Sequence, residues 1–207
     1  MTAHVDYFFS VASPWTFLGS QRFIDMAHRT GATVMVRPMD FSRVMAAAGG
    51  LPYQQRPVQR ASYRQDDLAR WRQRLGIPLT LEPAFYPVDR TPASLAVIAA
   101  RHISQHAALV LSHAVLRAIW QEDLDIASWE LLESLADASG LNGAALMDTA
   151  RTPEIAEAFR LDTEAAIGAR VFGAPTWVVD GERFWGQDRL DFLEERIADS
   201  APESQPT

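Results

Sequence analysis

The start of the chain has a strand–helix–strand pattern of hydrophobic and polar positions. Residues 4–9 form a short, aromatic-rich run that predicts a buried strand. Ser13 and Pro14 supply an N-cap and a first helical residue, and the apolar positions after them share one helical face up to about Gly31. Residues 33–37 are β-branched and predict a second strand. Because the connection between the strands holds a helix, we expect them to be parallel.

The middle of the chain is mostly helical in its periodicity. Residues 42–54 contain two glycines and a proline with little periodicity, so we expect an irregular segment there. Residues 58–75 and the stretch from about 92 to 168 carry helical patterns. These residues therefore predict a long, all-helical region.

The end of the chain returns to strand signals. Residues 175–179 read as a strand, the Asp180–Gly181 pair predicts a tight turn, and residues 182–185 predict the returning strand. Residues 190–197 have the pattern of an amphipathic helix.

Neither end of the chain has enough strands for an independent sheet, but together they would form a four-stranded mixed sheet with helices on its faces. We therefore predict an α/β, thioredoxin-like fold. Residues 1–41 and 170–200 would form its thioredoxin-like domain, residues 42–169 an inserted all-helical domain, and residues 201–207 a flexible tail.

The amino-acid composition limits the catalytic chemistry and the partners that the chain can have. The 207 residues include no cysteine, and all 19 basic residues are arginine. This composition excludes disulfides, a cysteine nucleophile and chemistry at a lysine amine. The net charge of −7 argues against a nucleic-acid partner. The start of the chain lacks the basic region of a signal peptide, and no apolar run is long enough for a membrane span. We therefore expect a cytoplasmic location and no membrane partner.

Ser13 occupies the corner at which redox proteins with a thioredoxin-like fold carry a C-x-x-C motif. Ser13 and Thr16 stand where that motif has its two cysteines, so the chain cannot carry out dithiol–disulfide exchange by itself. Ser13 can serve simply as an N-cap. It can also donate a hydrogen bond to the sulfur of a bound thiol, and a helix N-terminus lowers the pKa of a thiol placed there. A second signal is Pro175, at a strand start where thioredoxin-like folds place a cis-proline opposite this corner.

Two further patterns have weaker support. His102 and His106 are spaced i, i+4 on an expected helix but lack the glutamate of a His-Glu-x-x-His motif, so we expect no metal. A catalytic triad on Ser13 lacks the Gly-x-Ser-x-Gly signature.

Two motifs, together with residues 68–71 and 75–79 between them, resemble the 2-hydroxychromene-2-carboxylate isomerase family. That family belongs with kappa-class glutathione transferases and DsbA-like oxidoreductases. The first is VDYFFS at 5–10 followed by SPWTFLG at 13–19, and the second is VFGAPT at 171–176 followed by FWGQDRL at 184–190. The resemblance implies an isomerase of aromatic-compound catabolism that moves an aromatic pyruvate between cis and trans forms. In this family a glutathione sulfur adds to the substrate and leaves again.

The resemblance also assigns site residues. It implies glutathione as cofactor, with Ser13 at its sulfur and the backbone of Ala174, beside a cis-Pro175, along its peptide. The γ-glutamyl end would be enclosed by Trp185, Gly186, Gln187 and Asp188. The Asp188 carboxylate is a suitable partner for the α-ammonium group of glutathione.

The substrate side departs from the family pattern. A family lysine falls on Met45, an asparagine–arginine pair falls on Gln54 and Gln55, and a family tyrosine matches Tyr86. We expect Arg43, or an arginine between residues 56 and 74, to replace the missing cation. Two alternatives stay open: a kappa-type glutathione transferase, and a non-catalytic thioredoxin-like module that binds a thiol ligand or a peptide. The resemblance also implies a homodimer.

Overall fold

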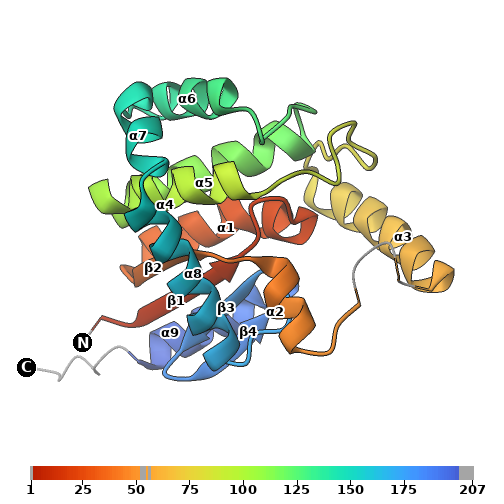
Figure 1. Cartoon of the computed structure of the whole chain (residues 1–207). Coiled ribbons are helices and arrows are strands. Elements are labelled where there is room, and N and C mark those ends of the chain that lie inside the picture. Colours follow the sequence, from red (N-terminus) through yellow and green to blue (C-terminus); the bar gives the residue numbers. More distant parts are fainter. Residues whose placement is uncertain (1, 52–54, 56, 201–207) are drawn as a thin grey trace, which may run out of the picture.

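The computed structural model of the chain describes residues 2–51, 55 and 57–200 (Figure 1). Within them no helix is both long and apolar enough to cross a membrane. The elements, in chain order, are β1 (His4–Phe9), α1 (Pro14–Thr30), β2 (Thr33–Pro38), α2 (Phe41–Ala47), α3 (Val58–Leu75), α4 (Thr91–Ile103), α5 (Gln105–Trp120), α6 (Trp129–Ala138), α7 (Gly143–Ala150), α8 (Pro153–Gly168), β3 (Thr176–Val179), β4 (Glu182–Trp185), the short 3-10 helix η2 (Gln187–Arg189) and α9 (Leu190–Asp199).

The strands of the described residues form one mixed sheet in the order β2-β1-β3-β4. β1 pairs in parallel with β2, while β3 is antiparallel to both β1 and β4. The first and last parts of the chain therefore meet at the centre of the sheet. This arrangement confirms the predicted thioredoxin-like α/β fold with a helical region between its two halves.

Successive side chains of the central strands point to opposite faces of the sheet, so the core has two layers. Tyr7, Phe9 and Trp177 are buried on one face in a cluster that also includes residues of α1, α4, α5 and α9. Phe8 and Val178 point to the other face and pack with residues of α2 and α8. Helices thus cover both faces of the sheet (Figure 1).

Two expectations about local structure were wrong. Residues 41–47 form helix α2 rather than irregular chain, because the Asp40 side chain accepts the N–H groups of Ser42 and Arg43 and Val44 is buried against the neighbouring core. His102 and His106 do not share a helix. α4 ends at Ile103, and Ser104 caps the start of α5.

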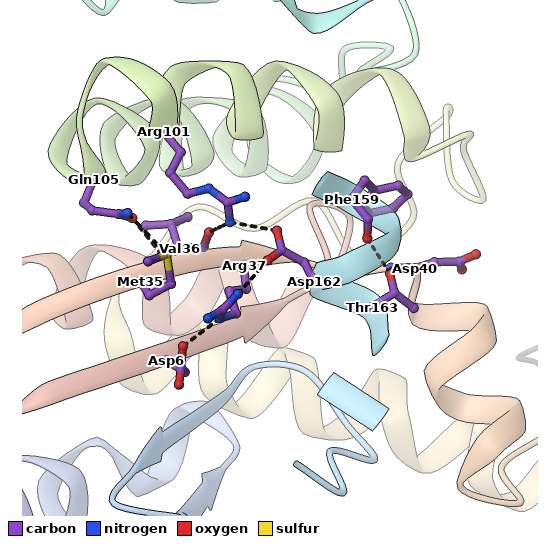
Figure 2. Close-up of polar contacts among 10 residues, drawn as sticks. All are labelled: Asp6, Met35, Val36, Arg37, Asp40, Arg101, Gln105, Phe159, Asp162 and Thr163. Atoms are coloured by element: carbon purple, nitrogen blue, oxygen red, sulfur yellow. Dashed lines mark hydrogen bonds and ion pairs between the residues drawn. The ribbon is translucent and has the colours of Figure 1, made fainter. Parts of the chain in front are cut away.

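A buried carboxylate ties α8 to β2 and α4 (Figure 2). Asp162 is only 2% exposed and accepts from Arg37 at 2.8 Å and from Arg101 at 2.7 Å. Arg37 also donates to Asp6 of β1 at 2.6 Å. Burial raises the pKa of Asp162 above its ordinary value, although both guanidinium groups oppose that shift. The cluster links the helical region to the sheet through charges that are largely removed from water.

Candidate active site

Ser13 lies between the end of β1 and the start of α1, and it caps that helix. Its backbone is extended, and its Oγ accepts the N–H of Thr16 at 3.2 Å. Pro14 occupies the first helical position, and no acidic residue lies in the first turn. The predicted N-cap is therefore confirmed. The positive end of the α1 dipole is not offset by a side chain of that turn.

The structure brings Ser13 next to a segment far away in the sequence. The Ala174–Pro175 peptide bond is cis, as predicted. The Ser13 hydroxyl donates to the carbonyl oxygen of Ala174 over 3.4 Å, which is long for a hydrogen bond between oxygens. β3 begins at Thr176, so the backbone of Ala174 lies just outside the sheet ladder. The hydroxyl proton is thus held weakly and faces the turn before β3.

The segment 185–188 follows β4 and lies against the same turn. The N–H of Gly186 donates to the carbonyl oxygen of Pro175 at 3.0 Å. The Trp185 indole is half exposed and lies over Gly173, where an added Cβ would be 2.0 Å from Nε1. Gly186 has a φ of 101°, and its Cβ would be 2.5 Å from Oδ1 of Asp188. The two glycines therefore allow Trp185 and Asp188 to fold back over the turn.

Gln187 and Asp188 differ in their surroundings. Gln187 is 2% exposed, and Arg22 of α1 donates to its backbone carbonyl at 3.0 Å and to its side-chain Oε1. Asp188 is exposed, and its Oδ2 pairs with Arg189 at 2.7 Å. Of the two predicted ligand residues, Asp188 can meet a ligand with its side chain, while Gln187 has its side chain turned into the protein.

Together these groups match the parts of a thiol-containing peptide. A hydroxyl donor and a helix N-terminus suit a sulfur, the backbone before cis-Pro175 suits a peptide, and the Asp188 carboxylate suits an ammonium group. The space that Gly186 leaves for Oδ1 of Asp188 keeps that carboxylate oxygen close to the turn. The residues present therefore fit glutathione.

Of the residues predicted on the substrate side, Arg43 and Met45 lie on α2. Arg43 is exposed and pairs with Glu164 of α8 at 3.2 Å. Met45 is half buried and lies so close to Gly50 that an added Cβ there would be 2.3 Å from its Cε. Gln55 is exposed, and Gln54 lies outside the described residues.

Tyr86 sits in the loop before α4 and is half buried. Its ring packs on Trp120, with 5.1 Å between centroids, and the guanidinium carbon of Arg64 from α3 lies 5.7 Å from the Tyr86 centroid. The N-terminal end of α1, α2 and α3 lie at the same end of the molecule (Figure 1). Arg64 is thus an arginine of the predicted range that meets a predicted substrate residue.

Sequence reasoning did not single out Arg22. The residue stands three positions after Gly19, where an added Cβ would be 2.9 Å from the Cβ of Gln187. A small residue and an arginine at i, i+3 on one helical face is the only local signal, and it is too common to be informative.

Comparisons with known proteins agree with this architecture. Residues 4–198 match the model of the DSBA-like thioredoxin domain. A 2-hydroxychromene-2-carboxylate isomerase of Sphingobium xenophagum is 34% identical over 96% of this chain and 100% of its own. Human glutathione S-transferase kappa 1 is 25% identical over 91% of this chain and 88% of its own.

A solved structure of a 2-hydroxychromene-2-carboxylate isomerase is also similar. It superposes with a TM-score of 0.78 and 31% identity, covering 95% of each chain. The likeness extends over the sheet and the helical region alike. The chain therefore belongs to the DSBA-like thioredoxin domain family and, within it, to the 2-hydroxychromene-2-carboxylate isomerases.

Proposed function

We propose that the protein is a glutathione-dependent cis–trans isomerase that acts on 2-hydroxychromene-2-carboxylate or a related aromatic pyruvate. One observation carries the proposal: in a chain without cysteine, the hydroxyl of the α1 N-cap Ser13 faces the backbone that precedes cis-Pro175. The 34% identity with a full-length isomerase supports this substrate class, and the kappa transferase relative supports glutathione as the cofactor.

Ser13 would hold the sulfur of glutathione in its reactive form. When bound, glutathione supplies a thiolate nucleophile that the chain itself lacks. Among the described residues, the hydroxyl proton of Ser13 is held by the long 3.4 Å contact to Ala174 and can turn toward that sulfur. The partial positive charge of the α1 N-terminus favours the thiolate over the thiol. Together these groups would lower the pKa of the bound thiol.

The segment 185–188 would bind the other end of glutathione. The Asp188 carboxylate is the charged partner for the α-ammonium group, with Arg189 as its partner in the free protein. Trp185 would cover the ligand with its half-exposed indole. Gly186 and Gln187 would shape this segment through the backbone, since the Gln187 side chain is already held by Arg22.

Arg64 is our candidate for the cation that receives the substrate carboxylate. It meets Tyr86, which the family resemblance places against the substrate, whereas Arg43 is an exposed partner of Glu164. An arginine beside an aromatic face can bind a carboxylate while the ring contacts the aromatic part of the substrate. We expect Arg64→Met to raise KM for the substrate about tenfold, and Arg43→Met to leave it nearly unchanged. The reverse order would assign the role to Arg43.

A homodimer and a cytoplasmic location remain part of this proposal. The homodimer rests on the family, and the location rests on the hydropathy and charge pattern of the sequence. Light scattering of the purified chain tests the first, since a homodimer has twice the 23.0 kDa mass of the chain. Fractionation of cells that express the chain tests the second.

An absorbance assay separates the candidate activities. We expect conversion of 2-hydroxychromene-2-carboxylate that depends on added glutathione, and little conjugation of a chlorinated aromatic. Conjugation without isomerisation would favour a kappa-type transferase. Glutathione binding without either activity would favour a binding module and contradict the proposal.

A further inference from the structure

Arg22 is a half-buried charge on α1 that the site described above does not use directly. Its Nη2 donates to the backbone carbonyl of Gln187 at 3.0 Å and also to the side-chain Oε1. Burial lowers the pKa of Arg22, while Asp191 and Asp188 oppose the shift. Its Nε is buried and has no hydrogen-bond partner within the described residues. Burying a guanidinium in this way costs free energy. Its two bonds to one residue therefore indicate a specific role for the contact.

The surface of α1 around Arg22 is shaped for the same neighbour. An added Cβ at Gly19 would be 2.9 Å from the Cβ of Gln187, so the helix and the segment approach as closely as glycine allows. Gly19 and Arg22 are three residues apart and therefore share one face of the helix. Both contacts are with residue 187, which lies between Gly186 and Asp188 in the candidate ligand segment.

The segment 185–188 is thus held from two sides. Gly186 donates to the carbonyl of Pro175, and Arg22 binds Gln187 from α1. The helix that carries Arg22 is also the helix whose N-cap is Ser13. The bonds of Arg22 therefore link the segment that carries Asp188 to the helix that begins after Ser13. Asp188 and Ser13 are the two points that a bound glutathione would span.

We propose that Arg22 is a positioning residue that aligns the segment 185–188 with the γ-glutamyl end of bound glutathione. This inference rests on the proposed function. It predicts that Arg22 affects only ligands that carry the γ-glutamyl group. The dipeptide Cys-Gly keeps the thiol and lacks that group, so it separates this role from general support of the fold.

Isothermal titration calorimetry of the whole chain with glutathione and with Cys-Gly tests the proposal. We expect Arg22→Met to raise the Kd for glutathione about tenfold and to leave the Kd for Cys-Gly unchanged. Arg22→Lys keeps the positive charge and an N–H donor group but loses the planar guanidinium, so it should restore part of the glutathione affinity. Arg29→Met removes an exposed arginine from the same helix, where it pairs with Glu194, and should change neither Kd.

Three results would overturn the inference. Arg22→Met could bind glutathione as the wild type does, or it could weaken both ligands equally, which would indicate a purely structural role. The wild type could bind Cys-Gly as tightly as glutathione. Where Arg22→Met does not fold, Arg22→Lys carries the same comparison, with a smaller loss confined to glutathione. A wild type that binds no glutathione contradicts the proposed function itself, which distinguishes that failure from the others.

Discussion

At the scale of single residues, two glycines shape the candidate site. Gly173 leaves room for the Trp185 indole, and Gly186 adopts a φ of 101° that brings Asp188 back over the turn before β3. Side chains at these positions would occupy the space that Trp185 and Asp188 now fill.

Gly186→Ala tests this effect. The backbone at this position is nearly restricted to glycine, which costs about 1–3 kcal/mol for alanine, and the new Cβ would strike Asp188. We expect the free energy of unfolding to fall by that amount and glutathione affinity to fall about tenfold or more.

Gly168→Ala is the matched control for that change. Gly168 is the last residue of α8, and outside its own helix backbone and chain neighbours no atom of the described residues lies within 4 Å of an added Cβ. Gly168→Ala should therefore make the protein slightly more stable. Equal stability and equal glutathione affinity of the wild type and Gly186→Ala in denaturant titrations and calorimetry would contradict the account.

The sequence predicts some of these residues and not others. Ser13 and cis-Pro175 lie at an N-cap and a strand start, so short patterns mark both. Gln187 is predicted to help enclose a ligand, which stays a prediction, and the sequence did not indicate that its side chain accepts from Arg22. That bond joins residues 165 positions apart, and only the folded chain brings them together.

At the scale of elements, Asp162 joins α8, β2 and α4. Asp162→Asn removes the carboxylate charge and leaves Arg101, whose side chain is 12% exposed, without its carboxylate partner. We expect the free energy of unfolding to fall by about 3 kcal/mol.

Glu164→Gln changes an exposed carboxylate two residues away on the same helix. It pairs with Arg43 and Arg160 at the surface and should cost less than about 1 kcal/mol. If denaturant titrations gave the same loss in free energy of unfolding for Asp162→Asn and Glu164→Gln, burial of the Asp162 cluster would not contribute to its stabilising effect.

The contact between α1 and α5 predicts a pH dependence. His113 Nδ1 is 2.8 Å from Ser20 Oγ, and burial lowers the pKa of His113, with Arg117 adding to the shift and Asp25 opposing it. The unfolded chain then binds a proton more readily than the folded protein. The contribution of His113 to stability is therefore complete above the ordinary pKa of about 6.5 and is lost as the pH falls through the folded value.

Thermal melts across this range check the prediction. We expect the wild-type Tm to fall as the pH is lowered from about 7 to about 5, and His113→Asn to show a smaller fall. The exposed His102→Asn should follow the wild type. Identical pH profiles for the wild type and His113→Asn would contradict this account of the α1–α5 contact.

At the scale of the whole molecule, most of the architecture could be predicted from hydrophobic periodicity. The strand bounds, α1, α3 and the helical region follow from local patterns that agree with the tertiary structure. Helix α2 was not predicted, because apart from the Asp40 cap it depends on burial of Val44 against residues of α8. The division into two domains at residues 41 and 170 remains a prediction.

The substrate side of the site likewise depends on contacts between segments that are distant in the sequence. Tyr86 precedes α4, Arg64 lies in the middle of α3, and their contact joins segments that have no common motif. By contrast, the cofactor side combines β1, α1 and β3, whose pairing is a property of the fold. The fold therefore predicts where a sulfur would bind better than where a carboxylate would.

The central claim is that Ser13 and the α1 N-terminus seat a glutathione thiolate. Ultraviolet titration of thiolate absorbance in the protein–glutathione complex measures the pKa of the bound thiol directly. We predict a pKa at least about one unit below the ordinary thiol value of about 8.5, and a return toward that value in Ser13→Ala. A bound thiol that titrates like free glutathione in the wild type, with no change in Ser13→Ala, would contradict the claim.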